Sequence, residues 1–356
     1  MSNSEIGKRA RRALIQTGAQ RIERLEQTHQ GNAQAADHGG RGCRSRQPFL
    51  GQDEMSSTQV ANKPAWPMVE LPSPFSYERG TIRLLEDRDL TPEELLTKLL
   101  SEDYDRPFVF DDGNTRSLYF SLRYVQSTMR TSDPTSLEFA YTRKMMSFLL
   151  FQEKTRSILM LGLGGGSLAK FCYTHLPWCQ ISVVEIDPYV IGFRDQFFIP
   201  ADDERFQVIH DDAARYIENC SSRPDVIMMD AFDRNGFSTS IDSCKFYQKA
   251  RSVLSLDGML IANLAGSRNE RLKHLNAIQE AFEDRLLIMQ VGNDGNHVVL
   301  AFRNAMFEPR WNWIESQAKA LQASYRIDFP RMAKKLERSE KLGYLERINN
   351  APALSM

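Results

Sequence analysis

A cluster of glycines is the first place in this sequence where the backbone could closely approach a ligand. An apolar run leads into Gly162, Gly164, Gly165 and Gly166, and a helical pattern begins at Ser167. A dinucleotide site needs G-x-G-x-x-G, whose last position is Ser167 here, and a phosphate loop needs a Gly-Lys-Ser/Thr sequence that is absent. The spacing G-x-G-x-G is typical of folds that bind an adenosyl sulfonium, where no phosphate has to be held. The turn therefore predicts an adenosyl sulfonium ligand.

Acidic residues follow the next apolar runs of the sequence. They and their neighbours are Glu185 and Ile186, then Asp211, Asp212 and Ala213, then Asp230 and Asp233. Ligands of an open parallel sheet bind outside the carboxyl ends of its strands. Glu185 can accept two hydrogen bonds from ribose hydroxyls, and Asp212 can accept one from an adenine amino group. NAD folds also place an acid at the position of Glu185, so an NAD-dependent oxidoreductase remains a distant alternative.

A parallel sheet would bring these strand ends together. From residue 157 onward, continuous apolar runs alternate with helical patterns, which is typical of strands covered on both faces. The runs are 157–163, 179–187, 206–212, 224–232 and 258–265. A last pair, 285–292 and 296–303, is separated by N-D-G-N and predicts antiparallel strands. We predict an α/β fold in which residues 151–308 form a doubly wound, mostly parallel seven-stranded sheet.

Two further regions flank the predicted sheet. Residues 66–150 alternate apolar and polar residues around a D-D-G-N turn, which predicts a small β-rich subdomain. It includes a short helix capped by Thr91 and an amphipathic helix at 136–151 that packs on the main domain. Residues 309–356 predict a C-terminal helical extension that either flanks the sheet or mediates a contact between copies, which leaves a homodimer open.

The first 65 residues have little to bury. A short basic amphipathic stretch is followed by a segment rich in Gly, Gln, Ala and Arg, which predicts a disordered leader. Because acids are interspersed in the basic stretch, a dispensable tail is favoured over an organelle or nucleic-acid address. Met55 is an alternative start.

Composition excludes several classes of protein. Lys and Arg number 45 and Asp and Glu 46, a net charge of −1, so no overall field attracts nucleic acid or a membrane surface. No apolar run approaches the ~18 residues of a membrane span. The five cysteines are scattered without a C-x-x-C pair, which predicts reduced thiols in a cytoplasmic protein with no disulfide framework. The histidines lack partners at ligand spacing, so no metal is expected.

Several of these segments together resemble the polyamine aminopropyltransferases (spermidine synthases) and their spermidine-synthase-like relatives. Across residues 115–305, "ILMLGLGGGSL" resembles the glycine-rich turn of that family and "VVEIDPYVI" its ribose-binding strand end. In the same way "DDAARYI" resembles its adenine segment and "DVIMMDAFD" its D-S-S-D-P loop. Upstream, Gln126 and Tyr141 resemble a Gln and a Tyr that line the site of the family. The resemblance implies a fold of the adenosylmethionine-dependent methyltransferase/spermidine synthase type.

The resemblance also implies a reaction, the transfer of an aminopropyl group to an amine in polyamine biosynthesis. The donor would be decarboxylated S-adenosylmethionine, or S-adenosylmethionine itself. Its nucleoside would be held by Gln126, Gly162, Gly164, Gly165, Gly166, Glu185, Ile186, Asp211, Asp212, Ala213 and Asp230. Asp230 and Tyr141 would be catalytic, with Asp230 as base or positioning group for the amine nitrogen. Asp233 would pair with the remote ammonium of a polyamine, although capping of the following turn is nearly as good an interpretation.

The sequence also departs from this family. Gly165 stands where the family carries an acid that takes the aminopropyl ammonium, and "DAFDR" lacks the serines and proline of the D-S-S-D-P loop. Thr142 follows the tyrosine where the family has Gln or His. A methyl donor with its own carboxylate suits a turn without the acid. An S-adenosylmethionine-dependent methyltransferase acting on a small molecule is therefore the second hypothesis. A non-catalytic nucleoside- or polyamine-binding protein is the third.

Overall fold

A computed structural model describes residues 66–74, 79–233, 236, 237, 241, 243–292 and 296–341. The predicted leader and the alternative start at Met55 lie outside the described residues, as does the end of the C-terminal extension. Within the described ranges, none of the helices has both the length and the apolar character needed to cross a membrane.

The large sheet has seven strands in the order β13–β14–β12–β9–β6–β7–β8. Their bounds are β6 Ser157–Leu161, β7 Gln180–Glu185, β8 Phe206–His210, β9 Val226–Met229, β12 Met259–Leu264, β13 Leu286–Gln290 and β14 His297–Phe302. Strands β12, β9, β6, β7 and β8 are parallel, whereas β14 runs antiparallel to both β12 and β13. The predicted doubly wound, mostly parallel sheet is confirmed. Strand order reverses at β6, so the crevice between the ends of β6 and β9 is the expected ligand position.

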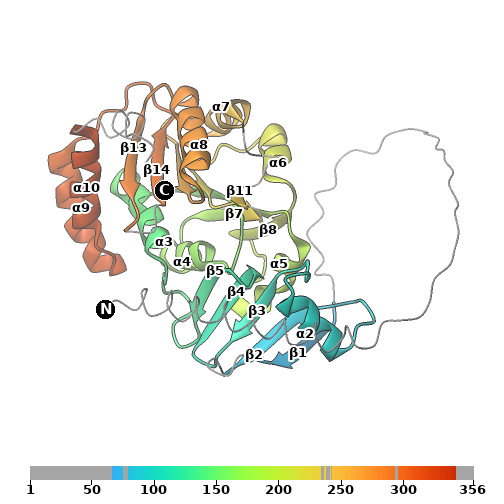
Figure 1. The fold of residues 1–356 in the computed structure, drawn as a ribbon. Helices are drawn as coiled ribbons and strands as arrows, with labels where there is room; N and C mark the ends of the chain where they lie inside the picture. The colour runs from blue at the N-terminus through green and yellow to red at the C-terminus, as the bar shows by residue number, and fades with distance from the viewer. Residues whose placement is uncertain are drawn as a thin grey trace, which may run out of the picture.

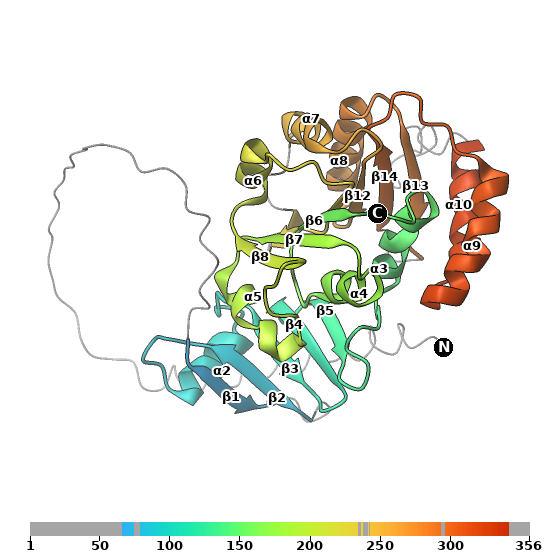
Figure 2. The same cartoon turned by 180° about the vertical axis from the view of Figure 1, so that it is seen from behind.

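Helices cover both faces of this sheet (Figures 1 and 2). They are α3 Ala140–Met145, η1 Met146–Leu150, α4 Ser167–His175, α5 Pro188–Gly192, η2 Arg194–Phe197, α6 Ala213–Asn219, α7 Cys244–Val253, α8 Arg268–Ala281, α9 Trp311–Tyr325 and α10 Phe329–Lys341. Alternate residues of β6 face opposite sides, because a strand has a side-chain period of two. Ile158 and Met160 join the core with α3, α4, α5, α9 and α10, whereas Leu159 and Leu161 join the core with α6, α7 and α8.

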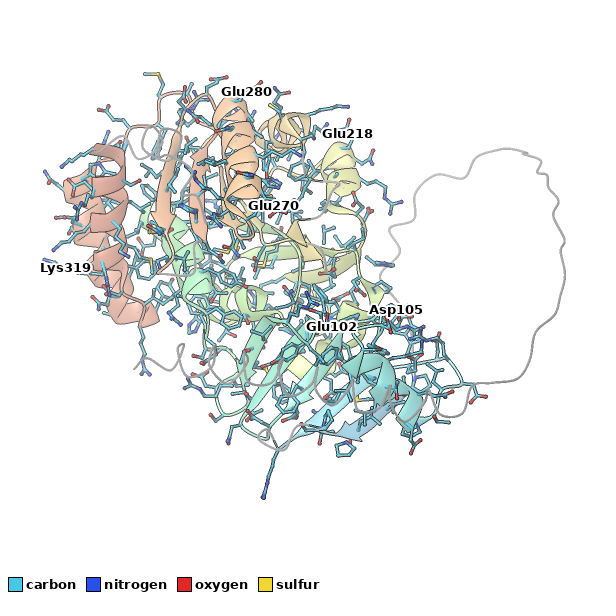
Figure 3. The ribbon with its side chains drawn as sticks, viewed as in Figure 1. Glu102, Asp105, Glu218, Glu270, Glu280 and Lys319 are labelled. Atoms are coloured by element: carbon cyan, nitrogen blue, oxygen red, sulfur yellow. The ribbon has the colours of Figure 1, made fainter. Side chains whose placement is uncertain are left out.

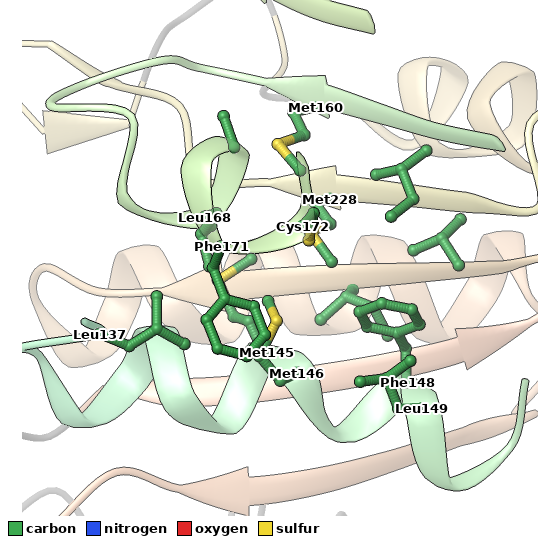
Figure 4. Close-up of a cluster of buried hydrophobic side chains, with 14 of the residues drawn as sticks. Leu137, Met145, Met146, Phe148, Leu149, Met160, Leu168, Phe171, Cys172 and Met228 are labelled. Atoms are coloured by element: carbon green, nitrogen blue, oxygen red, sulfur yellow. The ribbon is translucent and has the colours of Figure 1, made fainter. Parts of the chain in front are cut away.

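The helix predicted at 136–151 is shorter than its apolar pattern. It begins at Ala140 and continues as a 3-10 helix from Met146. Leu137 is buried although it precedes the helix, so the apolar pattern extends beyond the helical residues. Met145 and Phe148 belong to the same core as Phe171 of α4, and Figure 4 shows Met145 beside Phe171 and Phe148 farther along, near Leu149. This contact places α3 under the strand ends that carry the site.

A second sheet precedes the large one and is antiparallel throughout. Its strands are β1 Met68–Pro72, β2 Thr81–Leu85, β3 Phe108–Asp111, β4 Thr115–Ser121 and β5 Tyr124–Arg130, paired in sequence order, with helix α2 Pro92–Leu100 inserted after β2. The D-D-G-N turn joins β3 to β4, where Asp112 Oδ1 accepts hydrogen bonds from the backbone of Asn114 at 2.8 Å and Thr115 at 2.7 Å. Thr91 caps α2 in a capping box with Glu94, as its sequence predicts. Strands β1 and β5 were not predicted.

The two C-terminal helices flank the sheet beside β13 (Figure 1). Ile314 and Leu321 of α9, and Phe329 and Met332 of α10, are buried in the same core as α3 and α4. Charged side chains such as Lys319 lie on the outer side of these helices (Figure 3). Of the two predicted roles of this extension, flanking the sheet is the one that these contacts support.

Candidate active site

The glycine turn joins β6 to α4 and contacts the end of β9. Gly162, Gly164 and Gly166 have φ values of +97°, +51° and +65°, which favour glycine. A Cβ atom on Gly162 would lie 2.4 Å from the backbone oxygen of Asp230. The Gly162 amide donates to the oxygen of Val184 at 2.8 Å. The turn therefore holds the ends of β6, β7 and β9 close together, and it needs glycine at position 162 for two separate reasons.

These two reasons can be separated by a pair of alanine variants. Gly113, at φ +90°, has no atom within 4 Å of an added Cβ, so Gly113→Ala tests the conformational cost alone, about 1–2 kcal/mol. Gly162→Ala adds a collision with backbone, and we expect it to lower the free energy of unfolding by about 3 kcal/mol or more. Chemical denaturation of both variants measures the difference. Equal losses would show that the β9 end moves aside at little cost.

Glu185 lies buried at the end of β7, with 8% of its surface exposed. Its Oε2 accepts a hydrogen bond from the amide of Leu163 at 2.8 Å, and its Oε1 accepts one from the amide of Asp187 at 2.9 Å. Burial raises the pKa of Glu185, although these backbone hydrogen bonds oppose the shift. The two amides fix the orientation of the carboxylate, and each oxygen keeps a second lone pair. That arrangement suits a diol presented to the turn, which is the predicted role of Glu185.

The end of β8 lies directly beside the end of β7. The amide of Asp211 donates to the oxygen of Glu185 at 3.1 Å, and the Asp211 carboxylate pairs with Arg215 at 2.5 Å. Asp212 caps α6, which begins at Ala213, and its Oδ1 accepts from the amide of Arg215 at 2.9 Å. If Asp212 also binds adenine, it does so while its Oδ1 caps the N-terminus of α6. This double use is possible because a carboxylate has two oxygens.

Ile186 directly follows Glu185 at the end of β7 and stands out by its exposure. Its side chain is 54% exposed, although its neighbour Glu185 is buried. The ring of His210 hydrogen-bonds to the backbone oxygen of Ile186 at 3.0 Å, which fixes the local backbone. An exposed apolar side chain at a strand end offers a surface on which a flat ring can pack.

Asp230 follows β9 and hydrogen-bonds to Tyr141 of α3 and Asn263 of β12. Nδ2 of Asn263 donates to Asp230 Oδ1 at 2.9 Å, and Tyr141 forms a further hydrogen bond with the same carboxylate. Burial raises the pKa of Asp230, although both hydrogen bonds oppose this shift. Burial and the adjacent Asp230 charge raise the pKa of Tyr141 well above its usual value, so its phenol remains a proton donor at neutral pH. The structure thus brings together two of the three predicted catalytic residues.

Asn263 was missed in the sequence, although it is central to this cluster. It is 2% exposed, and within the described part of the chain its Oδ1 has no hydrogen-bond partner. Buried polar atoms are normally satisfied, so an unpartnered acceptor on the residue that donates to Asp230 sets this position apart from the apolar remainder of β12. The available signal was a single amide within the otherwise apolar run of β12.

Gln126 lies in a β-bulge of the small sheet. Leu118 pairs with Ser127 and Tyr119 pairs with Val125, which leaves Gln126 as the extra residue of β5. Bulges next to functional sites redirect a side chain. Ser127 borders the glycine turn, because a Cβ atom on Gly165 would lie 2.6 Å from Ser127 Oγ. Gln126 therefore directly precedes, in the sequence, a residue that borders the glycine turn. Its contact with a nucleoside stays a prediction.

Asp233 is the predicted residue about which the structure says least. Its backbone belongs to β10 (Phe232–Asp233), which pairs with β11 (Gly236–Phe237), while its side chain lies outside the described part. Its two predicted roles, ammonium binding and turn capping, both stay predictions. Within the described residues, no group of three or more His, Cys, Asp or Glu side chains is arranged to hold a metal ion.

Comparison with known proteins matches a large part of this chain to a protein family. The spermine/spermidine synthase domain matches residues 138–290. A polyamine aminopropyltransferase of Neisseria meningitidis is 33% identical over 233 residues, which cover 65% of this chain and 89% of that protein. An eEF1A lysine and N-terminal methyltransferase of Xenopus laevis is 34% identical over 144 residues, 37% of this chain and 21% of that protein.

A solved structure supports the same fold. The probable spermidine synthase of Corynebacterium glutamicum ATCC 13032 is 19% identical and superposes with a TM-score of 0.50, over 60% of this chain and 84% of that one. At this level of identity the similarity concerns the fold alone. Together with the extended match to the Neisseria relative, these findings confirm the resemblance inferred from the sequence motifs. The chain belongs to the spermine/spermidine synthase family, and it is therefore a transferase.

Proposed function

We propose that this protein transfers the aminopropyl group of decarboxylated S-adenosylmethionine to a nitrogen of a small amine or polyamine. The observation that carries the proposal is the cluster of Asp230, Tyr141 and Asn263 at the carboxyl end of β9. It lies against the glycine turn, at the position where a doubly wound sheet binds its ligands. Membership of the family and the similarity to a polyamine aminopropyltransferase support this assignment.

The donor nucleoside would lie across the ends of β6, β7 and β8. Glu185, already oriented by two amides, would accept hydrogen bonds from the ribose hydroxyls. Asp212 would accept one from the adenine amino group, and the exposed side chain of Ile186 would pack against the adenine ring. The glycine turn leaves backbone free to approach the sulfonium arm. The same pocket would accept S-adenosylmethionine, since the nucleoside is common to both donors.

The acceptor amine would bind at Asp230. Within the described residues, the side chains that hydrogen-bond to this carboxylate, Tyr141 and Asn263, are both neutral. A partly buried carboxylate with only neutral partners favours an incoming cation. Recognition of this kind favours a cationic amine over a neutral alcohol or an anionic carboxylic acid, because the carboxylate has no cationic partner among the described residues.

The reaction would be a single displacement. An ammonium must lose a proton before its nitrogen can attack, and Asp230 would accept that proton. The nitrogen then forms a bond to the carbon beside sulfur while the C–S bond breaks, and the sulfonium leaves as a neutral thioether. The raised pKa of Asp230 makes it a better base than an exposed aspartate, and Tyr141, which keeps its proton, would hold it in place. Most of the acceleration would come from holding nitrogen and carbon in line.

One observation favours a second candidate, methyl transfer from S-adenosylmethionine. A Cβ atom on Gly165 would meet Ser127 at 2.6 Å and 2.9 Å and Phe197 at 3.1 Å, so no acidic side chain can extend from this position without displacing its neighbours. The turn thus has no acid to bind the ammonium of an aminopropyl donor. It also has no negative charge that would repel the carboxylate of S-adenosylmethionine. The similarity to an eEF1A lysine and N-terminal methyltransferase points in the same direction.

The two candidates differ in both of their products. The protein should be incubated separately with each donor and with a set of diamines and polyamines, and the mixtures analysed by mass spectrometry. Aminopropylated amine together with methylthioadenosine would support the leading proposal. Methylated amine together with S-adenosylhomocysteine would replace it by the methyltransferase. Binding of a donor without turnover of any acceptor would instead favour a nucleoside- or polyamine-binding protein.

A further inference from the structure

A short segment between α5 and β8 packs against the glycine turn. We call residues 194–199 the turn-support segment. A Cβ atom on Gly165 would lie 3.1 Å from Cδ1 of Phe197, and one on Gly166 would lie 2.5 Å from Cγ1 of Ile199. Both apolar side chains are buried. Since the turn has no side chains of its own at these positions, the segment fills the space behind it and limits its conformation.

Two basic side chains from different elements donate to the carbonyl groups at the end of this segment. The 3-10 helix ends at Phe197 and is followed by Phe198, which has a left-handed φ of +53°. Helix ends leave backbone carbonyls that need partners. Arg116 of β4 donates from Nη1 to the oxygen of Gln196 at 2.7 Å, and Lys170 of α4 donates from Nζ to the oxygen of Phe197 at 2.7 Å. The segment is thus held by the small sheet on one side and by the helix after the glycine turn on the other.

Arg116 is itself fixed within the small sheet. Its Nε donates to Asp111 Oδ2 at 2.7 Å, and its guanidinium lies 5.1 Å from the centre of the Phe198 ring. Asp111 also accepts from the amide of Gly113 at 2.8 Å and pairs with Arg83. Burial opposes ionisation of Asp111, but these hydrogen bonds lower its pKa, so it is a carboxylate at neutral pH. A continuous series of contacts therefore connects β3 and β4 to the glycine turn.

The buried position of Lys170 is unfavourable for stability, although its amine donates to only one carbonyl group. Its side chain is buried, with 2% of the residue exposed, and the hydrogen-bond acceptor of Nζ is a neutral backbone oxygen. Burial of an ammonium without a charged partner costs stability, and it lowers the pKa of Lys170 to about 7. The Lys170 amide donates to the oxygen of Gly166 at 2.8 Å, so its side chain extends from the first turn of α4. Its placement at the turn, despite this cost, indicates a role other than stability.

We infer that Arg116 and Lys170 are positioning residues, which hold the turn-support segment against the glycine turn and so keep the donor site preformed. The inference rests on the proposed function, because it takes the glycine turn as the donor site. Neither side chain touches the donor. Each acts through the carbonyl groups of Gln196 and Phe197 and the packing of Phe197 and Ile199 on the turn.

The test combines donor affinity with thermal stability. Arg116→Met and Lys170→Met keep an unbranched, mostly apolar side chain and remove the terminal hydrogen-bond donor. For each variant we expect the Kd of both donors to rise about tenfold in isothermal titration, while kcat at saturating donor stays within about twofold of the wild type. Lys170→Met removes both the desolvation cost of a buried amine and its hydrogen bond to Phe197, which have opposite effects on stability, so Tm should change little. A structural role alone would not separate affinity from stability in this way. Arg116→Lys retains a cation near Gln196 and should recover part of the affinity.

Arg130→Met is the matched control for the two variants. Arg130 of β5 pairs with Glu138 at 3.0 Å and is largely exposed, so Arg130→Met should leave donor Kd within about twofold. Unchanged donor affinity in both Met variants, with the wild type binding normally, would overturn the inference and leave the proposed function intact. Affinity that falls only in step with Tm, Lys170→Met included, would also overturn it. A wild type that binds neither donor would instead remove the proposed function itself.

Discussion

Replacement of Asp230 by Asn is expected to lower kcat by about 10³-fold, within the range attributed to a general base. The change keeps side-chain shape and removes proton acceptance, so donor Kd should change little. Stability should stay the same or rise. An acid whose folded pKa lies above its unfolded value contributes less stability as pH rises through that interval, and the amide of Asn does not ionise and so avoids this loss. Steady-state kinetics, titration of the donor and thermal unfolding measure the three effects.

The pH profile gives this prediction a second readout. The base acts only when deprotonated, so the rate of the wild type should rise with pH through the raised pKa of Asp230 and then level off. Tyr141→Phe removes a hydrogen bond that lowers this pKa and should move the rise to higher pH. Asp257→Asn, which changes an exposed aspartate outside the cluster, is the control and should leave the profile unchanged. Normal turnover by Asp230→Asn would exclude Asp230 as the base.

Glu185→Ala should weaken both donors by about 100-fold, because two charge-assisted hydrogen bonds to the ribose contribute about 3 kcal/mol. The factor should be equal for S-adenosylmethionine and its decarboxylated form, since the ribose is common to both. Isothermal titration of each donor measures it. Glu185→Gln should recover little, because a Gln amide cannot accept from the amides of Leu163 and Asp187 with both of its terminal atoms.

Asp187→Asn is the matched control for this variant. Asp187 caps α5 by accepting from the amide of Tyr189 at 2.8 Å, and Asn caps a helix about as well as Asp. The control therefore changes a charge two residues from Glu185 while it preserves the local backbone, and donor affinity should change only slightly. If Glu185→Ala binds both donors as tightly as the wild type, the nucleoside does not lie at the end of β7.

The large sheet was predictable because its signals are local. Continuous apolar runs, a positive-φ glycine turn and an N-D-G-N hairpin each identify an element from a few neighbouring residues. Strands β1 and β5 carry no such signal. β1 ends at Pro72, and β5 contains the polar residues Gln126, Ser127 and Thr128, whose strand geometry depends on pairing with distant partners. The late start of α3 has a related cause, since Leu137 is buried by tertiary packing before the helix begins.

The residues of the candidate site likewise include some that the sequence identifies locally and others that only the fold brings together. Glu185 and Asp230 were identifiable because an acid directly after an apolar strand lies at the ligand edge of a parallel sheet. The hydrogen bonds of Asp230 with Tyr141 and Asn263 join residues from three elements far apart in sequence, and no local pattern specifies them. The same holds for Arg116 and Gln196, which are 80 positions apart along the chain.

The close approach of Ser127 to Gly165 has a consequence for how this lineage can change. An acidic side chain introduced at 165 collides with Ser127 and Phe197, so the substitution is harmful while Ser127 is present. Removal of Ser127 first would open the space at the cost of its hydroxyl contact with Ser167. The two positions are therefore epistatic. An acidic side chain at position 165 should therefore be better tolerated after Ser127 is replaced by a smaller residue than while Ser127 is present.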